Sequence, residues 1–171
     1  MTKYIALAAI TLDGKIARNS SHMTDWTSKE DKEFLHKELK KGDVILVGNN
    51  TYKTAKKPRA KRKCVVFTRA VRTTKRVNDR LLYCNPEHTD LKKLMRTLGY
   101  KRTHILGGAE TYDFCLKKHI FDELYLTIEP LVFGKGISIF NKKQKNSAFV
   151  LVSVKKLNAQ GSILLHYKRR I

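Results

Sequence analysis

The feature that most constrains this sequence is a strand–glycine–helix junction, in which the apolar run Ile105-Leu106 meets Gly107-Gly108 and a helical segment follows. Such a junction presents backbone N–H groups and the positive end of a helix dipole, which together suit an anionic ligand. Glycine also lets that ligand approach the backbone, because no Cβ stands in the way. Taken alone, a glycine pair is equally typical of a loop.

A second junction of this kind lies upstream, where the apolar run 44–47 meets Gly48 and continues into Asn49-Asn50-Thr51-Tyr52. In an open α/β sheet, ligands bind beyond the carboxyl ends of the parallel strands. The two junctions together therefore predict one extended anionic ligand that lies across this edge of a parallel sheet.

The rest of the chain alternates strands with helices and then changes to β-structure alone. Tyr4–Ile10 is almost wholly apolar, which predicts a strand buried on both faces. Ser28, with Asp31 three residues later, predicts the start of a helix that runs to about Lys40. Further strands are predicted at 44–47, 64–68, 81–84, 123–128 and 137–140, further helices at 50–58, 90–98 and 109–116, and a terminal hairpin from 149–154 and 162–167. This order predicts an α/β fold with a mixed, mostly parallel sheet flanked by helices and a C-terminal antiparallel hairpin.

Length and composition fit one domain over residues 1–171. A chain of 171 residues buries a sufficient core without a disulfide or a metal. No apolar run approaches the ~20 residues of a membrane span and no signal-peptide pattern is found, so the cytoplasm is the expected location. Cys64, Cys84 and Cys115 are scattered without a Cys-x-x-Cys pair, which argues against a disulfide framework and against a metal site.

The charge of the chain is strongly basic, with 36 Lys and Arg against 15 Asp and Glu, a formal net charge of +21. Such a field attracts anions, including phosphorylated cofactors, polyglutamate tails and nucleic acid. The basic residues are spread along the chain, and aromatic residues are not interleaved with them as base-stacking platforms would be. Nucleic acid is therefore not the expected partner, and an RNA-binding module is kept as a remote alternative.

Six motifs, in order along the chain, resemble the dihydrofolate reductase superfamily, which also contains the reductase domain of riboflavin biosynthesis. They are Ala8-Ala9-Ile10 with 13–17, Trp26 followed by Asp31, the segment 47–52, Arg62 ahead of 65–69, the segment 105–112, and the segment 122–127. The resemblance runs nearly end to end and implies a dihydrofolate reductase-like fold.

The resemblance implies that NADPH lies across the sheet, with its pyrophosphate on the two glycine–helix junctions. Thr68 and Arg69 would meet the adenosine 2′-phosphate, to which an arginine fork is suited. The family's cis peptide is expected between Gly107 and Gly108. Asn49 stands where folate-reducing members often carry a basic residue, so the preference for NADPH over NADH stays open. The implied cofactor-binding residues are Ala9, Ile16, Gly48, Asn49, Asn50, Thr51, Thr68, Arg69, Leu106, Gly107, Gly108, Ala109, Glu110, Thr111 and Tyr112.

Asp31 matches the family's single acidic residue that grips the pterin. Its carboxylate can accept from a ring N–H and from the exocyclic amine, which fixes the orientation of the heterocycle. Partial burial would raise its pKa and help to protonate the imine that receives the hydride. Glu30 is the competing residue, because a small shift in helix phase would exchange the two acids. The alternative role for Asp31 is that of a first-turn acid that only complements the helix dipole.

The other residues implied on the substrate side lie on several segments. Trp26 would pack near the cleft, and Thr127 would orient water or the carboxylate. Arg62 would hold the α-carboxylate of a glutamate tail, with a solvated basic loop as the alternative for its neighbours. The implied catalytic residues are Asp31, Trp26 and Thr127, and the implied substrate-binding residues are Ala9, Asp31, Leu35 and Arg62.

The substrate-side pattern also departs from that of folate reductases. Lys32 stands where they usually have an apolar residue against the pterin.

The loop 18–24 would close over the nicotinamide.

The first hypothesis is therefore an NADPH-dependent reductase that converts 7,8-dihydrofolate to tetrahydrofolate by hydride transfer, on the strength of Asp31 and Arg62. The alternative is the riboflavin-pathway reductase, which acts on 5-amino-6-(5-phosphoribosylamino)uracil, and the segment 25–28 favours it. Against that alternative, the acidic-Pro motif that usually follows Val-Gly-x-x-Thr is absent, as is a zinc-binding deaminase signature. Either enzyme would take a small-molecule substrate, avoid membranes, and act as a monomer or a homodimer.

Overall fold

The computed structural model describes residues 1–54, 61–141 and 146–170. No helix in these ranges is long and apolar enough to cross a membrane. The elements, in chain order, are β1 (Lys3–Thr11), β2 (Lys15–Ala17), the 3-10 helix η1 (Thr24–Trp26), α1 (Lys29–Leu39), β3 (Val44–Gly48), α2 (Asn49–Thr54), β4 (Cys64–Phe67), β5 (Thr74–Asn78), β6 (Leu81–Cys84), α4 (Leu91–Thr97), β7 (Arg102–Ile105), α5 (Ala109–Lys117), β8 (Glu123–Glu129), β9 (Ile137–Ser138), β10 (Phe149–Lys156) and β11 (Ile163–Arg169).

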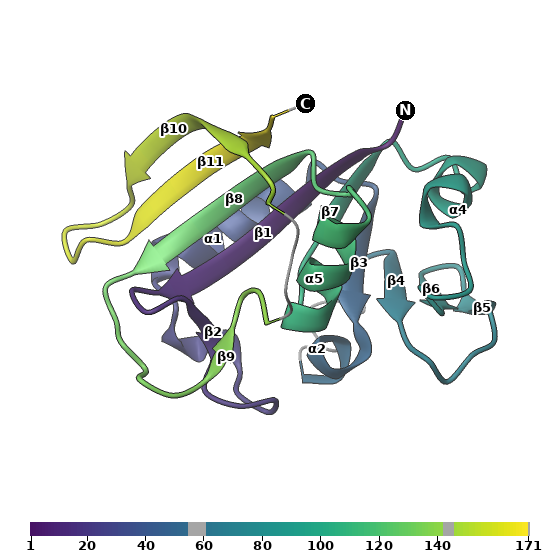
Figure 1. The fold of residues 1–171 in the computed structure, drawn as a ribbon, viewed down its shortest axis with the longest axis horizontal. Helices are drawn as coiled ribbons and strands as arrows, with labels where there is room; N and C mark the ends of the chain where they lie inside the picture. The colour runs from purple at the N-terminus through teal and green to yellow at the C-terminus, as the bar shows by residue number, and fades with distance from the viewer. Residues whose placement is uncertain (55–60, 142–145, 171) are drawn as a thin grey trace.

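Within the described residues, nine of the strands form one sheet in the order β10-β11-β8-β1-β7-β3-β4-β6-β5 (Figure 1). The six strands from β8 to β6 in this order run parallel to one another. Antiparallel strands flank them, β5 at one edge and the β10–β11 hairpin at the other. The predicted mixed, mostly parallel sheet with a C-terminal hairpin is thereby confirmed.

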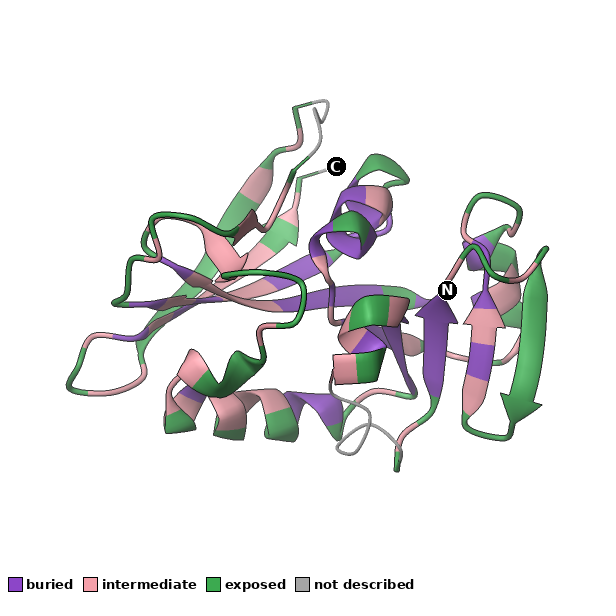
Figure 2. Cartoon of the chain, turned by 90° about the horizontal axis from the view of Figure 1, so that it is seen from below, coloured by how far each residue is buried: buried purple, intermediate pink, exposed green. Residues whose placement is uncertain are grey.

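Helices cover both faces of the parallel strands, so that successive strand residues enter two different cores. Tyr4 and Ala6 of β1 pack in one cluster, together with Met95 of α4 and side chains of α5. Ile5 and Leu7 pack in the other cluster, together with α1. Figure 2 shows the buried strands between these layers. The apolar run predicted to be buried on both faces is therefore confirmed.

Local signals set where the helices begin. The Ser28 hydroxyl accepts from the backbone N–H of Asp31 at 3.2 Å, which caps α1 as predicted. Asp90 caps α4 in the same way, accepting from the N–H of Lys93 at 3.0 Å. The helix predicted over 50–58 is described as α2 up to Thr54, and Pro58 lies outside the described residues.

Two features of the sheet were not predicted. β5 was missed because all five of its residues are exposed, and its sequence, Thr-Lys-Arg-Val-Asn, has no apolar face. The predicted edge segment 137–140 does not join the main sheet, because Ile137 and Ser138 pair with β2 in a separate two-stranded sheet. The three cysteines are buried, and no disulfide joins them in the described part of the chain.

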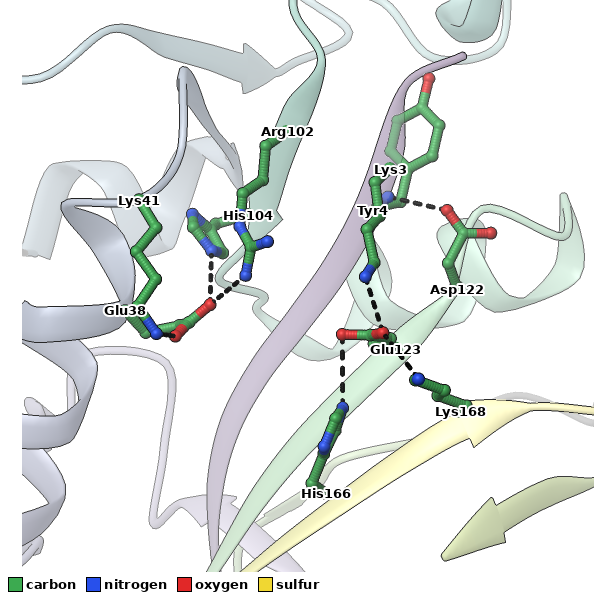
Figure 3. Close-up of polar contacts among 10 residues, drawn as sticks. All are labelled: Lys3, Tyr4, Glu38, Lys41, Arg102, His104, Asp122, Glu123, His166 and Lys168. Carbon is green, nitrogen blue, oxygen red and sulfur yellow. Dashed lines mark hydrogen bonds and ion pairs between the residues drawn. The ribbon is translucent and has the colours of Figure 1, made fainter. Parts of the chain in front are cut away.

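The amino ends of the parallel strands hold ion pairs around buried carboxylates (Figure 3). The carboxylate of Glu38, at the end of α1, forms ion pairs with Lys41 Nζ at 2.6 Å and with the guanidinium of Arg102. It also lies 3.5 Å from His104 Nε2. Burial alone would raise the pKa of Glu38, but the Lys41 and Arg102 cations hold it below its ordinary value. The first residue of β8, Glu123, is likewise paired with Lys3 at 2.7 Å.

Candidate functional site

A cavity of about 700 Å³ opens at the carboxyl ends of the parallel strands, the opposite end from these ion pairs. The ends of β3, β4 and β7 border it, together with the middle of β1 and Thr127 of β8. Side chains of α1 line one part, and the first turns of α2 and α5 line another. The cavity thus lies where the two glycine junctions predicted a ligand.

The two glycine junctions are bonded directly to each other. The backbone N–H of Gly48 donates to the carbonyl of Gly107 at 2.7 Å. The peptide between Gly107 and Gly108 is cis, as the family resemblance implies. The carbonyl of Gly108 accepts from the N–H groups of Thr111 and Tyr112 at 3.0 and 3.1 Å, so α5 begins at this corner.

The corner is too crowded for any residue other than glycine at Gly48 and Gly107. A Cβ on Gly48 would lie 2.8 Å from Thr111 Oγ1. A Cβ on Gly107, whose φ is +78°, would lie 2.6 Å from the Tyr112 ring. That ring is fixed because its hydroxyl donates to the carbonyl of Leu7 at 2.6 Å. A backbone packed this closely at the start of a helix presents polar N–H groups rather than side chains to a ligand, which is the setting that suits a phosphate.

Arg69 lines the cavity just beyond β4. Its Nε donates to Glu87 Oε1 at 3.2 Å, and Glu87 also lines the cavity. Both side chains are exposed, so this pair contributes little to stability. An arginine held only by an exposed pair remains available to a phosphate dianion.

Asp31 is the buried acid of the cavity, with 7% of its surface exposed. Desolvation raises its pKa above the ordinary value, while hydrogen bonds with the hydroxyls of Thr127 and Thr27 partly oppose the rise. The nearby carboxylate of Glu129 raises it further. Asp31 therefore combines burial, cavity access and a raised proton affinity, which is typical of functional carboxyl groups.

A hydrogen-bond network behind Asp31 fixes the start of α1. Glu129, buried at the end of β8, accepts from the N–H and the hydroxyl of Ser28, both at 2.8 Å, and from the hydroxyl of Ser162. Asn158, in the turn between β10 and β11, donates to Ser162 Oγ at 3.0 Å and to Glu30 Oε2 at 3.1 Å. The helix turn that carries Asp31 is thus tied to the C-terminal hairpin.

This network also separates the two candidate acids. The hydrogen bond from Asn158 lowers the pKa of Glu30, which is not among the cavity-lining residues. The phase of α1 therefore places Asp31, and not Glu30, at the cavity, while the role of Asp31 stays a prediction.

Most of the predicted site residues meet around this cavity. Those that line it are Ala9, Ile16, Asp31, Leu35, Gly48, Asn49, Asn50, Thr51, Thr68, Arg69, Leu106, Gly108, Ala109, Glu110, Thr111, Tyr112 and Thr127. Gly107 is not a lining residue, but its carbonyl holds Gly48 in place. Their roles toward cofactor and substrate stay predictions.

Two predicted residues lie elsewhere. The guanidinium of Arg62 donates to the carbonyl of Leu39 at 2.9 Å, and it lines a separate small pocket at the amino end of β3. Trp26 packs edge-on against Phe133, with ring centroids 5.1 Å apart, and is absent from the cavity lining. The sequence signal for Arg62 was its place in a run of basic residues. Such a run does not determine which of its residues matches the family position or where that side chain points.

The cavity also contains residues that were not predicted as binding residues. They are Leu7 and Ala8 of β1, Ala17 of β2, Asn19, Ser20, His22, Met23 and Thr24 from the segment after β2, Thr27, Lys32 and Phe34 around α1, and Thr54, Phe67, Pro86, Glu87, Phe114, Ile137 and Asn141. The loop was expected to cover the nicotinamide, and its residues do line the cavity. Lys32 had been noted only as a departure from folate reductases, and its Nζ donates to the carbonyl of Asp25 at 3.2 Å.

Comparison with known proteins agrees with this geometry. The family model described as the RibD C-terminal domain matches residues 2–163. The uncharacterized protein YwjB of Bacillus subtilis (strain 168) is 24% identical over 175 residues, which cover 98% of each chain.

Two solved structures show the same fold. A pyrimidine reductase-like protein from Corynebacterium diphtheriae superposes with a TM-score of 0.80 at 16% identity, covering 99% of this chain and 92% of that one. Dihydrofolate reductase from Enterococcus faecalis, complexed with NADP(H), superposes with a TM-score of 0.69 at 18% identity, covering 99% and 97%. These likenesses confirm the predicted dihydrofolate reductase-like fold. Since the family model spans nearly all of the sequence, the chain belongs to the RibD C-terminal domain family.

Proposed function

We propose that this protein is an NADPH-dependent reductase whose substrate is a phosphorylated aminopyrimidine, 5-amino-6-(5-phosphoribosylamino)uracil, rather than dihydrofolate. The observation that carries the proposal is one cavity with two unlike sides. One side is the close-packed backbone corner at Gly48 and Gly107–Gly108, and the other is the buried acid Asp31.

The backbone corner fits the pyrophosphate of a dinucleotide. The absence of a Cβ at Gly48 lets this strand end pack directly against Thr111 and the Gly107 carbonyl, so that the corner is made of backbone groups. The first turn of α5 lines the cavity there and supplies the positive end of its dipole. Arg69, at the same lining, would take the 2′-phosphate in place of its exposed partner Glu87.

Asp31 would bind and orient the heterocycle opposite the nicotinamide. When bound, NADPH supplies the hydride, and the protein supplies orientation and a proton. A carboxyl group with a raised pKa holds a proton more readily at neutral pH and hydrogen-bonds the N–H and carbonyl edge of a pyrimidine. Thr127 and Thr27 keep this carboxyl in place through their hydroxyls.

Three observations favour the pyrimidine over dihydrofolate. The family match is to a riboflavin-pathway reductase domain, which supports the alternative of the sequence analysis better than its first hypothesis. Arg62 donates to the carbonyl of Leu39 and does not line the cavity, so it offers no cation there for a glutamate tail. Lys32 brings a cation to the lining beside Asp31, where a phosphorylated substrate needs one.

The test is to follow NADPH consumption with the aminopyrimidine ribotide and with dihydrofolate in parallel. We expect turnover with the ribotide and little with dihydrofolate. Turnover with dihydrofolate alone would overturn the choice of substrate, and absence of NADPH binding by calorimetry would overturn the proposal as a whole.

Lys32 allows a sharper version of this test. Lys32→Gln is expected to raise KM for the phosphorylated substrate about tenfold, a loss of ~1.4 kcal/mol, with kcat near that of the wild type. Lys29→Gln, which removes an exposed lysine that does not line the cavity, is the matched control. Equal KM values for wild type and Lys32→Gln would show that Lys32 does not bind the phosphate.

A further inference from the structure

Positive charge is concentrated at one end of the molecule, the end that β4, β5, β6 and α4 form (Figure 1). The segment 61–102 contains these elements and has 13 Lys and Arg residues against 3 Asp and Glu. Its formal charge of +10 is nearly half of the +21 of the whole chain. The reductase site proposed above accounts for little of this charge, because Arg69 is the only one of these cations that lines the cavity.

Most of the cations in this segment have no acidic partner. Arg102 and Arg69 pair with carboxylates, and Arg62 donates to a backbone carbonyl. The other ten are exposed, and none of them forms an ion pair within residues 1–54, 61–141 and 146–170. Several lie on β5 and in the turn after it, where the strand is exposed along its whole length (Figure 2). Unpaired charges of one sign repel one another, so a bound polyanion would stabilise this end.

An aromatic ring lies among these cations. Tyr100, between α4 and β7, is half-buried, and Lys63 Nζ lies over its ring at 5.7 Å from the centroid. Burial raises the pKa of the Tyr100 hydroxyl, and the nearby charge of Arg76 partly opposes that rise. Lys63 and Arg76 are 37 and 24 residues away from Tyr100 in the sequence, so it is the fold that brings both cations to one ring.

The acid nearest this ring in charge effect is already engaged. Asp43 raises the pKa of Tyr100 further, but its carboxylate accepts from the backbone N–H groups of Lys101 and Arg102 at 2.7 and 2.8 Å. The backbone of Tyr100 is also held, because its carbonyl accepts from the Thr2 hydroxyl at 2.8 Å. The ring therefore has a fixed position beside cations that an external anion can reach.

We propose that this basic end binds a single-stranded nucleic acid, with phosphates along β5 and the β5–β6 turn and a base stacked on Tyr100. Cations that follow the backbone, together with an aromatic ring that stacks a base, are the usual means of binding single strands without sequence preference. Arg76 and Arg80 supply planar forks that suit phosphate oxygens. The recognised group is the phosphodiester backbone, which RNA and DNA share.

The composition of this surface favours nucleic acid over an anionic membrane. Stable binding to a membrane takes inserted apolar groups in addition to basic residues. Among the large apolar side chains that are exposed in the described residues, only Val77 belongs to the segment 61–102. The sequence argument against nucleic acid was that aromatic and basic residues are not interleaved along the chain, and at Tyr100 the fold brings them together.

The proposed surface is separate from the cavity. Lys63 and Tyr100 lie just ahead of β4 and β7, at the amino ends of the parallel strands, whereas the cavity opens at the carboxyl ends. Neither of them lines the cavity, nor does Arg76 or Arg80. The nucleic acid and a cofactor in the cavity should therefore bind at the same time.

The first experiment measures binding of the full chain to labelled RNA and DNA single strands of one mixed sequence by fluorescence anisotropy, with and without saturating NADPH. We expect micromolar dissociation constants at physiological salt, with RNA and DNA within about threefold of each other and no effect of NADPH. Failure to bind either strand overturns the proposal. Release by NADPH would show that the strand occupies the cavity, and a strong preference for RNA or DNA would contradict recognition through the shared backbone.

Two variants of equal charge locate the surface. Lys75→Gln/Arg76→Gln/Arg80→Gln should weaken binding at least tenfold and reduce the slope of log affinity against log salt by about 2, since each phosphate contact contributes about 0.7. The matched control, Lys29→Gln/Lys117→Gln/Lys135→Gln, removes three exposed lysines on other elements and should keep the slope of the wild type. Equal losses in the two variants would show that net charge alone attracts the strand, which contradicts the proposed surface.

Substitution of Tyr100 tests the stacked base. Tyr100→Leu should weaken binding of a single strand about tenfold, and Tyr100→Phe, which keeps the ring, should bind as the wild type does. Circular dichroism checks that both variants are folded. Equal binding by Tyr100→Leu and Tyr100→Phe would refute stacking on this ring. Binding to vesicles of anionic lipid that is tighter than binding to the oligonucleotides would identify a membrane as the partner and overturn the proposal.

Discussion

Asp31 and Glu38 are two buried acids on one helix, about two turns apart, and they have opposite environments. Glu38 has 1% of its surface exposed, and although burial opposes it, the cations of Lys41 and Arg102 hold its pKa down. Asp31 faces the cavity with hydroxyl partners, and burial raises its pKa. The difference shows that α1 spans both ends of the parallel strands, with an ion-paired acid at the amino ends and an acid held by hydroxyl groups at the carboxyl ends.

The two environments have opposite consequences for stability. A carboxyl group with a lowered pKa stabilises the fold above its unfolded-state pKa, and that contribution is lost as pH falls through its folded pKa. A carboxyl group with a raised pKa destabilises the fold as pH rises above its unfolded-state pKa. Glu38 belongs to the first kind and Asp31 to the second, as expected of a structural and a functional acid.

The largest effect is expected for Asp31→Asn. We predict that kcat/KM falls about a thousandfold at neutral pH, because the acid that we propose to orient and protonate the substrate is lost. The dissociation constant of NADPH should stay within about twofold, and the midpoint of thermal unfolding should rise, since an unfavourable buried charge is removed. Steady-state kinetics, calorimetry and thermal unfolding test these three outcomes, and full activity of the variant would refute the role of Asp31.

Glu38→Gln should show the reverse pattern. Removing the carboxylate leaves Arg102 and Lys41 without their buried partner, so we predict a loss of about 3 kcal/mol in the free energy of unfolding. Denaturant unfolding measures this loss. The folded variant should bind NADPH and turn over substrate as the wild type does. A variant of unchanged stability would show that this ion pair is not a structural element.

Two glycines of the same chain segment sharpen the comparison between strand ends. Gly48→Ala places a Cβ 2.8 Å from Thr111 Oγ1 at the carboxyl end of β3, and we predict a loss of NADPH affinity of about tenfold. Gly42→Ala, ahead of β3, places a Cβ 2.2 Å from His104 Nδ1, so it should lower stability and leave the affinity of the folded protein unchanged. Fluorescence titration and thermal unfolding separate the two effects, and equal loss of affinity in both variants would contradict the assignment.

The smallest effect is expected for Glu129→Gln. The carboxylate of Glu129 raises the pKa of Asp31, so its neutralisation should lower that pKa and move the Asp31-dependent limb of the pH–rate profile to lower pH by a fraction of a unit. The amide oxygen can still accept from Ser28, so kcat at the optimum should change little. A shift to higher pH would show that Glu129 does not act on Asp31 through its charge.

Much of the fold could be predicted because its strands are buried on both faces. The apolar runs of β1 and β3 and the cap at Ser28 are local signals that tertiary structure did not override. β5 lacked any such signal, since it is exposed along its whole length and owes its conformation to pairing with β6. The pairing of β2 with β9 likewise depends on a long-range contact, which the local sequence of neither segment predicts.

The site was predictable where it is made of backbone and less so where it is made of side chains. Gly107-Gly108 and Gly48 mark strand ends directly, and the structure brings them within hydrogen-bond distance. Asp31 and Glu30 are adjacent in the sequence, and only the phase of α1 and the contact with Asn158 separate them. Arg62 sits in a run of basic residues, and its direction depends on the carbonyl of Leu39, which no motif encodes.

The network around Glu129 has a consequence for how the protein acquires its activity during synthesis. The turn of α1 that carries Asp31 is held by hydrogen bonds that involve Ser162 and Asn158. The ribosome adds these two residues long after it has made that helix. A nascent chain that has completed the glycine corner, proposed to bind the nucleotide, still lacks the hydrogen bonds that hold this turn of α1. We therefore expect the proposed nucleotide side of the cavity to form first and the proposed substrate side, around Asp31, to form only when the last hairpin closes.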